Sequence, residues 1–282
     1  MVSADAFDAG WVDAATARAL AKESKLSEGL FLRSLIERAK KLSRSTMSNY
    51  RVGAVVLGGS GAIYLGANIE LPGSELCQTI HAEQSVVINA LSHGETRLAA
   101  LAISAAPCGS CRQFLNELAD ADRLAIWLAR DTPYSLVDLL PKSFGPQDLG
   151  VTGGLLAPQD NGLVTQGRPD AAGQAALDAA NRSYAPYTKS FAGCVFVLDD
   201  GTLWPGPYVE NAAFNPSLSP GQTALVGLTM AGRDWRTIRE VVLVETSDSP
   251  VDHRRALDQL LGSLGLGITP ATILVTAKVG EA

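Results

Sequence analysis

Two short segments carry the side chains best suited to bind a metal ion: His81-Ala82-Glu83 and Cys108-Gly109-Ser110-Cys111. Thiolates and an imidazole are the usual protein ligands of Zn²⁺, and two cysteines three residues apart can grip one ion from a single helical turn. Three protein ligands leave the fourth tetrahedral position for water, which distinguishes a catalytic zinc from a structural one. We therefore predict that His81, Cys108 and Cys111 bind one Zn²⁺ per chain.

Glu83 is the candidate for proton transfer beside that ion. Two residues along a regular helix correspond to a rotation of about 200°, so Glu83 and His81 can face one site only within the first helical turn, with the metal in front of the helix. The positive end of the helix dipole then favours thiolates and developing negative charge. A His-x-Glu segment followed by Pro-Cys-x-x-Cys, which begins here at Pro107, is the general signature of zinc-dependent nucleobase deaminases.

Two other interpretations of the cysteines stay open. Cys77 lies four residues before His81 and could be the fourth ligand of a closed, structural zinc site, which would leave Glu83 without a role. Alternatively, the Cys-x-x-Cys pair could be redox-active, although that chemistry does not need a His-x-Glu segment upstream. If Cys77 binds no metal, we expect it to be a small apolar residue of the core.

The segments that must position these residues alternate between helical and strand patterns. Residues 11–43 are rich in Ala, Leu, Lys and Glu and are predicted to be helical. Two apolar runs, 52–57 and 62–67, predict a β-hairpin that turns at Gly58-Gly59. Beyond it we expect a helix, a strand, a helix and a strand, at 81–91, 98–104, 111–118 and 124–128. This alternation indicates an α/β fold.

The second half of the chain weakly repeats the first. Residues 141–167 are rich in Gly, Pro, Asp and Gln and predict a connection, after which Tyr208-Val209-Glu210 follows the pattern of Asn68-Ile69-Glu70. Counting from Glu210 as from Glu70 to His81 leads to Gly221, and no further Cys-x-x-Cys follows. We predict an N-terminal helical segment (1–46), a catalytic zinc domain (47–150), a connection (151–170) and a degenerate, non-catalytic copy (171–282).

Composition and charge restrict the class of partner. The 282-residue chain has a formal net charge of −6, with 46% hydrophobic and 18% charged residues, so it can bury a sizeable core. Its Lys and Arg residues form no cluster longer than a pair, which argues against nucleic acid and for a small substrate. No apolar run is long enough to span a membrane, and the N-terminus lacks the layout of a secretory signal. We expect a cytoplasmic protein with reduced cysteines and no membrane partner.

The chain resembles the cytidine deaminases, specifically their longer homodimeric type from bacteria and plants. The resemblance is close from about Ser48 to Leu140 and continues through Asn181–Ala224. It implies a three-layer α/β/α fold with a mixed central sheet, duplicated in one chain, and assembly as a homodimer. It also implies roles for single residues: zinc ligands His81, Cys108 and Cys111, general acid/base Glu83, ribose ligands Asn68 and Glu70, an aromatic ring against the pyrimidine from Tyr50, and backbone contacts to the base at Ala82.

The function implied by the resemblance is hydrolytic deamination of cytidine and deoxycytidine to uridine and deoxyuridine in pyrimidine salvage. The enzyme would be a zinc-dependent hydrolase acting on a cyclic amidine. In the implied mechanism zinc-bound hydroxide attacks C4, while Glu83 takes the water proton, delivers it to N3 and later protonates the departing amine.

Several alternatives remain at the level of sequence. The substrate could be a nucleotide, a free base or a nucleoside antibiotic, and a nucleotide enzyme would need a phosphate-binding group, for which Arg51 and Arg112 are candidates. A zinc-stabilised binding module without catalysis is an alternative of another class. Apart from the resemblance, Asn68 and Glu70 would be ordinary polar residues at a strand end and Tyr50 a core aromatic. His253 is expected at the surface, and Ala212, Ala213 and Phe214 are candidates for the edge that approaches a partner subunit's active site.

Overall fold

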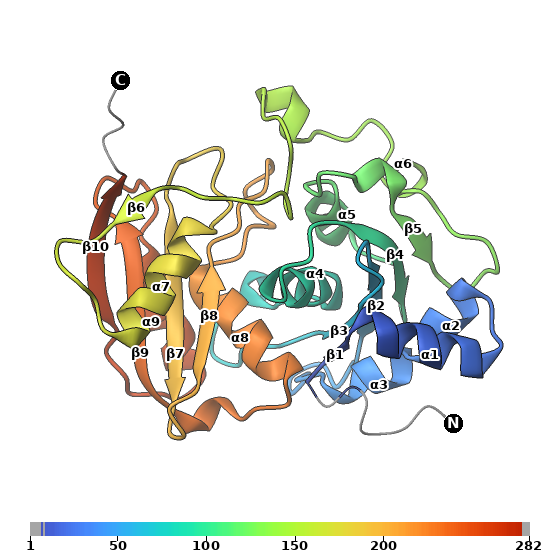
Figure 1. Ribbon diagram of the computed structural model, residues 1–282, viewed down its shortest axis with the longest axis horizontal. Coiled ribbons are helices and arrows are strands. Elements are labelled where there is room, and N and C mark those ends of the chain that lie inside the picture. Colours follow the sequence, from blue (N-terminus) through green and yellow to red (C-terminus); the bar gives the residue numbers. More distant parts are fainter. Residues whose placement is uncertain (1–6, 8, 278–282) are drawn as a thin grey trace.

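A computed structural model describes residues 7 and 9–277. Residues 1–6, 8 and 278–282, which fall in the predicted N-terminal segment and the predicted second copy, lie outside the described residues. Within the described part, the chain forms two five-stranded sheets, with strand orders β1-β3-β2-β4-β5 and β6-β10-β9-β7-β8 (Figure 1). Each sheet mixes parallel and antiparallel pairs, which confirms the predicted mixed α/β fold.

The first sheet is built around the predicted hairpin. Strands β2 (Gly53–Gly58) and β3 (Ile63–Ala67) pair antiparallel, β4 (Leu98–Ile103) adds antiparallel to β2, and β5 (Ala125–Trp127) adds parallel to β4. The segment 11–43, predicted to be helical, contains three helices, α1 (Ala14–Ser24), α2 (Glu28–Ser34) and α3 (Ile36–Lys41), and only its first two residues differ, since they form the strand β1 (Trp11–Val12). Because β1 pairs with β3, the N-terminal segment completes the sheet edge rather than standing apart from it.

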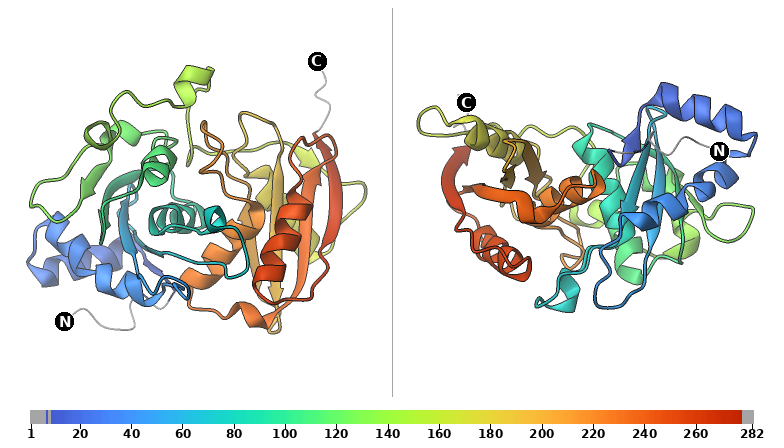
Figure 2. Two further views of the ribbon diagram at one scale, coloured as in Figure 1. Left: turned by 180° about the vertical axis from the view of Figure 1, so that it is seen from behind. Right: turned by 90° about the horizontal axis from the view of Figure 1, so that it is seen from below.

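Helices cover both faces of this sheet, as the alternation of side chains along β2 requires. Val55 packs with α1, α2 and α3 on the outer face, whereas Ala54 and Val56 pack with helices α4 (Ala82–Ser92) and α5 (Gly109–Leu115) on the inner face (Figure 2). The result is the predicted three-layer α/β/α arrangement. Helix α6 (Leu136–Leu139) and the 3₁₀ turns η2 (Leu76–Gln78), η3 (Ala121–Arg123) and η4 (Pro146–Leu149) lie in the connections.

The second half repeats this plan, which confirms the predicted duplication. Its elements are β6 (Leu163–Val164), α7 (Ala171–Asn181), β7 (Ala192–Leu198), β8 (Leu203–Pro207), α8 (Pro220–Met230), η5 (Trp235–Thr237), β9 (Ile238–Thr246), α9 (His253–Ser263) and β10 (Ala271–Ala277). The order β8-β7-β9-β10 matches β3-β2-β4-β5, and the pairing directions match as well. Only the edges differ, since β6 pairs with β10 where β1 pairs with β3.

Isolated β-bridges fix the correspondence between the halves and correct the count made from sequence. Ile69 pairs with Ile80 directly before α4, and Val209 pairs with Leu218 directly before α8. Ser219 therefore occupies the position of His81, and Gly221 that of Glu83. The count was wrong by two residues because the loop before α8 is two residues shorter than the loop before α4. The conclusion that this half lacks the His-x-Glu side chains is unaffected.

The two halves share one hydrophobic core around α4 and α8, which lie side by side between the sheets (Figure 1). Two glutamines at equivalent positions connect them reciprocally. The Gln84 amide donates to the carbonyl of Pro216 (3.0 Å), and the Gln222 amide donates to the carbonyl of Gln78 (3.0 Å). Pro216 and Gln78 are themselves equivalent, so the halves are related by an approximate two-fold axis. Among the described residues, no helix has the length and apolar character needed to cross a membrane.

Candidate active site

His81, Cys108 and Cys111 come together at the ends of two helices. His81 is the N-cap of α4 and Cys108 the N-cap of α5. His81 Nδ1 lies 3.6 Å from Cys108 Sγ and 3.2 Å from Cys111 Sγ, and the two sulfurs are 3.5 Å apart. Tetrahedral ligand atoms around Zn²⁺ are separated by about 3.5–3.8 Å, from Zn–S of about 2.3 Å and Zn–N of about 2.0 Å. Two of the three separations lie in this range and the third is slightly shorter, so the triangle is close to the size that zinc requires and leaves one coordination position open.

Cys77 does not join this triangle. Its side chain is exposed, and its sulfur contacts the carboxylate of Glu75 at 3.6 Å. Within the described part of the chain, the potential metal-binding group comprises His81, Cys108 and Cys111. The four-ligand structural site is therefore not formed, and the expectation that Cys77 is a core residue is wrong. Cys77 is carried outward by the turn η2, which precedes α4.

The pKa values of the two thiols shift in opposite directions because their sulfurs share one hydrogen bond. This contact, over 3.5 Å, is the main cause that lowers the pKa of Cys108 to about 5. The same hydrogen bond, followed by burial and the nearby Glu83 carboxyl, raises the pKa of Cys111. The backbone N–H of Cys111 also donates to Cys108 Sγ (3.5 Å). A cation between the sulfurs would favour the thiolate at both positions.

Glu83 lies in the first turn of α4, as the spacing from His81 requires. Its side chain is only 4% exposed, and it lines the same pocket as His81. Burial raises the pKa of Glu83, although hydrogen bonds from its own backbone N–H and from Cys111 oppose this shift. A raised pKa makes a carboxyl group a better proton acceptor, which suits the role of a general acid/base.

The pocket beside the triangle has a volume of about 290 Å³ and gathers nearly all of the predicted site residues. It is lined by Ser48, Tyr50, Val52, Asn68, Glu70, Thr79, His81, Ala82, Glu83, Ala105, Ala106 and Cys108. Cys111 is buried behind this lining. Five lining residues were not predicted as site residues: Ser48, Val52, Thr79, Ala105 and Ala106. Ala105 and Ala106 stand between the end of β4 and Pro107, and this proximity to the motif was the one signal for them in the sequence.

Asn68 and Glu70 hold the loop that forms one wall of this pocket. The Glu70 carboxylate accepts from the backbone N–H groups of Met47 (2.7 Å) and Ser48 (3.1 Å) and from the Ser48 hydroxyl. Burial opposes ionisation of Glu70, but these hydrogen bonds outweigh it and lower the pKa of Glu70. The Asn68 amide donates to the carbonyl of Tyr50 (3.0 Å) and accepts from the N–H of Val52 (2.9 Å).

Tyr50 lies at the mouth of the pocket. Its side chain is 62% exposed, so it is not a core aromatic. Arg112, one candidate for binding a phosphate, instead donates to the carbonyls of Pro107 (2.8 Å) and Leu139 (2.8 Å). Its guanidinium is thus used to hold the backbone on either side of α5.

The equivalent place in the second half is filled by side chains. Tyr208 takes the position of Asn68, and the ring of His253 packs edge-on against it with 4.4 Å between ring centroids. His253 is 1% exposed, its Nε2 lies 3.0 Å from the carbonyl of Ser190, and burial lowers its pKa to about 4. The expectation that His253 lies at the surface is therefore wrong. That expectation was drawn from the charged neighbours Arg254 and Arg255. These two residues are at least partly exposed to solvent, whereas His253 is buried.

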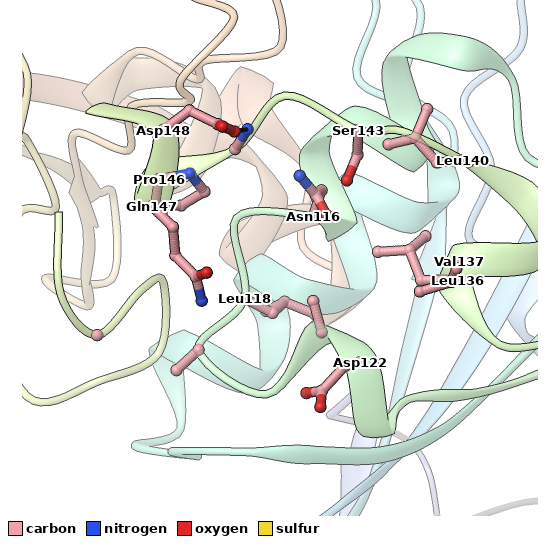
Figure 3. Close-up of a pocket in the computed structure, with 14 residues that line it drawn as sticks. Asn116, Leu118, Asp122, Leu136, Val137, Leu140, Ser143, Pro146, Gln147 and Asp148 are labelled. Carbon is pink, nitrogen blue, oxygen red and sulfur yellow. Dashed lines mark hydrogen bonds between the residues drawn. The ribbon is translucent and has the colours of Figure 1, made fainter. Parts of the chain in front are cut away.

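Figure 3 shows a larger cavity, of about 430 Å³, whose lining does not include His81, Cys108 or Cys111. It is bounded by the end of α5, by α6 and by η4, and its lining includes Asn116, Asp122, Leu136, Gln147 and Asp148. Asp148 is engaged in accepting from the N–H of Gly145 (2.7 Å). This cavity contains none of the three potential metal ligands, so size alone does not identify the reactive site.

Comparison with known proteins places this geometry in a family. Two family models described as the cytidine and deoxycytidylate deaminase zinc-binding region match residues 28–126 and 136–257. A cytidine deaminase from Photorhabdus laumondii is 42% identical over 88% of this chain and 84% of its own length. A cytidine deaminase from Vibrio atlanticus is 41% identical over 97% and 92%, respectively.

A solved structure of cytidine deaminase from Mycobacterium tuberculosis is 32% identical, covers 43% of this chain and 99% of its own, and has a TM-score of 0.38. The family-model match at residues 28–126 includes both the His-x-Glu and the Cys-x-x-Cys segments, and the similarity to the Vibrio atlanticus protein extends over nearly the whole chain. The chain belongs to the cytidine deaminase family.

Proposed function

We propose that this protein is a zinc-dependent hydrolase that deaminates cytidine and deoxycytidine to uridine and deoxyuridine, releasing ammonia, in pyrimidine salvage. The observation that carries the proposal is the triangle of His81, Cys108 and Cys111 beside the buried carboxyl of Glu83. A redox pair or a structural zinc site would have no use for that carboxyl. Relatives named cytidine deaminase support the choice of substrate.

In the proposed mechanism, His81 and the two cysteines hold the zinc and Glu83 moves protons. Bound zinc lowers the pKa of a coordinated water towards about 7. Glu83 would accept one proton from the attacking water and deliver it to N3 of the pyrimidine, and it would then transfer the remaining proton of that oxygen to the amino group, which leaves C4 as ammonia. Its buried position excludes bulk water from these transfers and keeps its pKa raised.

The proposed nucleoside site uses the other residues of the pocket that His81 and Cys108 line. Asn68 and Glu70 would bind the ribose, the ring of Tyr50 would lie against the pyrimidine, and the backbone at Ala82 would contact the base. All four residues line the 290 Å³ pocket together with Glu83. Binding the sugar would orient C4 towards the reactive water, which makes the attack effectively intramolecular.

A nucleotide is a weaker candidate substrate. Arg112 donates to two backbone carbonyls, so its charge is committed to the protein rather than offered to a phosphate. The net charge of −6 also disfavours nucleic acid as a partner. We therefore propose a free nucleoside as the substrate, with no nucleic-acid or membrane partner and with a cytoplasmic location, where thiolate ligands stay reduced.

The quaternary structure and the domain division are also part of the proposal. We propose a homodimer in which Ala212, Ala213 and Phe214 approach the partner subunit's active site. Phe214 is 61% exposed and has a positive φ of 62°, which supports an outward-facing role. Within each chain the proposed units are 1–46, 47–150, 151–170 and 171–282, with catalysis confined to the second of these.

The experiment is ultraviolet-monitored deamination by purified protein of known zinc content. The substrates are cytidine, deoxycytidine, cytosine and deoxycytidine monophosphate, each tested with the unaltered protein and with Glu83→Gln. We expect turnover of the two nucleosides, and for Glu83→Gln unchanged zinc content with activity lower by about 10²–10⁴-fold. If zinc is bound but none of the four substrates reacts, the proposal is wrong and a zinc-stabilised binding module becomes the better account.

A further inference from the structure

Glu117 is a fully buried carboxylate that the proposed chemistry does not use. It lies just beyond the end of α5, the helix whose first turn carries Cys108 and Cys111, and its side chain is 0% exposed. A buried carboxylate is costly unless several donors satisfy it. The identity of those donors shows what this residue connects.

All three hydrogen-bond donors to the Glu117 carboxylate come from the second half of the chain. The Tyr184 hydroxyl donates over 2.8 Å, the Tyr187 hydroxyl over 2.5 Å and the backbone N–H of Ala212 over 2.9 Å. The contact with Glu117 raises the pKa of both phenols, in addition to the larger effect of burial. Both phenols therefore stay protonated and remain donors at any physiological pH.

A second contact ties the same end of α5 to the same loop. The Asn211 amide donates to the carbonyl of Gln113 over 3.0 Å, and the Gln113 amide lies 3.4 Å from the Asn211 carbonyl oxygen. Asn211 is fully buried. In addition, the N–H of Leu155 donates to the Glu117 carbonyl over 2.7 Å. Both the backbone and the side chain at this end of α5 are therefore fixed.

The duplication shows that this connection is not a general requirement of the fold. Glu117 stands nine residues after the N-cap Cys108, just beyond the end of α5, and the residue nine after the equivalent N-cap Asp252 is Leu261, which is buried and apolar and lies within the longer α9. At this distance from the N-cap the second half thus has a hydrocarbon where the first half has a carboxyl group. The buried carboxyl group follows only the helix that bears the two cysteines.

We propose that Glu117 is a positioning residue through which the degenerate half orients α5 and, with it, Cys108 and Cys111. This inference rests on the proposed function only in taking those cysteines to be zinc ligands. Helix α5 has seven residues, too few to define its own direction, so anchoring its far end restricts how the first turn can tilt. The non-catalytic half would then act on the metal site through a hydrogen-bonded anchor within the same chain.

The test is zinc transfer from the loaded, full-length protein to an excess of a chromogenic chelator. We expect Glu117→Gln to release zinc about 10-fold faster than the unaltered protein, by analogy with residues that orient metal ligands from outside the coordination shell. Tyr187→Phe removes one donor and should give a smaller increase. For cytidine turnover we expect a lower kcat with an unchanged KM, because no pocket residue that would contact the ribose lies on α5.

Glu95→Gln is the matched control. Glu95 is also a buried carboxylate, and it accepts from the Ser60 hydroxyl (2.5 Å) and the N–H of Thr96 (3.0 Å), remote from α5. The control should lower the melting temperature without changing zinc release. If Glu117→Gln and Tyr187→Phe release zinc at the unaltered rate, the inference is overturned and Glu117 is a stabilising residue only. Zinc release needs no substrate, so it can support or overturn this inference even if cytidine turnover fails.

Discussion

At the scale of single residues, the duplication supplies an internal comparison for Glu70. Glu210 accepts from the N–H groups of Tyr187 (2.9 Å) and Thr188 (3.3 Å) and from the Thr188 hydroxyl. These are the equivalents of the three donors to Glu70. A glutamate at this position therefore holds its loop in both halves, whether or not a substrate binds there. Any role of Glu70 in binding a nucleoside is additional to this structural role.

Comparison of Glu70 with Glu210 separates the structural role of Glu70 from its proposed role in binding the ribose. We expect Glu70→Gln and Glu210→Gln each to lower the free energy of unfolding by about 1–3 kcal/mol, because each weakens hydrogen bonds to a buried carboxylate. Only Glu70→Gln should also raise KM for cytidine. Urea unfolding and steady-state kinetics measure the two effects. Equal kinetic effects of both substitutions would show that the loop, and not a contact to the ribose, accounts for the change.

The side chains of the site could be predicted because their chemistry is local in sequence. The His-x-Glu and Cys-x-x-Cys segments indicated zinc and a proton carrier before any fold was known. The other pocket residues could not be found this way. No motif marks Thr79, Ala105 and Ala106 in the sequence, and they line the pocket because the segment before α4 and the segment after β4 meet there. Burial of His253 depends likewise on a tertiary contact, with Tyr208.

At the scale of elements, one helix in each half packs very closely against a strand of the β-hairpin: α4 against β3 and α8 against β8. A Cβ added to Gly66 on β3 would lie 2.6 Å from the carbonyl oxygen of Ala82 on α4. The equivalent Gly206 on β8 has the same relation to α8, where an added Cβ would lie 2.6 Å from the Thr223 hydroxyl. Glycine at both positions therefore sets the distance between helix and sheet.

We expect Gly66→Ala and Gly206→Ala each to cost about 1–3 kcal/mol of stability, because backbone must move to admit the methyl group. Gly66→Ala displaces the helix that begins at His81, so it should also weaken zinc binding. Gly206→Ala displaces α8, which carries no metal ligand, and should leave zinc binding unchanged. Thermal unfolding and competition with a chelator measure the two properties. Equal zinc affinity in both variants would contradict the view that the position of α4 fixes His81.

The filled site of the second half gives the molecule a pH-dependent stability. The pKa of His253 is about 4, below its ordinary value of 6.5, mainly because of burial. Among the groups around His253, Asp252 favours the protonated imidazole and so opposes this shift. The ring of Tyr208 packs edge-on against the imidazole. Burial also raises the pKa of Glu245, which lies nearby. Between pH 6.5 and 4 the unfolded chain binds a proton at His253 that the folded chain does not. Stability is therefore lost as the pH falls through this range.

His253→Gln tests this contribution. Glutamine retains an N–H donor that can reach the carbonyl of Ser190 but does not titrate. Between pH 7 and pH 5 the unaltered protein should lose about 2 kcal/mol more of its unfolding free energy than the variant does. Urea unfolding at the two pH values gives this difference. An identical loss in both proteins would show that His253 is not the group responsible.

The order of the elements was predictable from periodicity, but their exact limits and partners were not. The hairpin, the helix after His81 and the strands around 98–104 and 124–128 all correspond to observed elements. Trp11–Val12 was taken as helical because two residues carry no periodicity, and they form a strand only because the edge of β3 is free to pair. The residue-by-residue correspondence between the two halves could be assigned only from the β-bridge between Val209 and Leu218.

At the scale of the whole molecule, the two halves are alike in fold but unequal in chemistry. Reciprocal hydrogen bonds from Gln84 and Gln222 join them about an approximate two-fold axis. Among the described residues, a group of three potential metal ligands close to one another occurs in the first half. In the second half the equivalent of His81 is Ser219, and His253 and Tyr208 fill the place where a substrate would lie. The molecule should therefore hold one reactive centre per chain.

The most direct test of this account is to restore zinc stepwise to the chelator-treated apoprotein while measuring cytidine deamination. Activity should rise linearly with added zinc and reach its maximum at one equivalent per chain. A maximum at two equivalents would contradict the single centre, since a second site would then be needed for catalysis. Deamination that is complete before any zinc is added, or absent at every zinc level, would contradict the zinc-dependent mechanism itself.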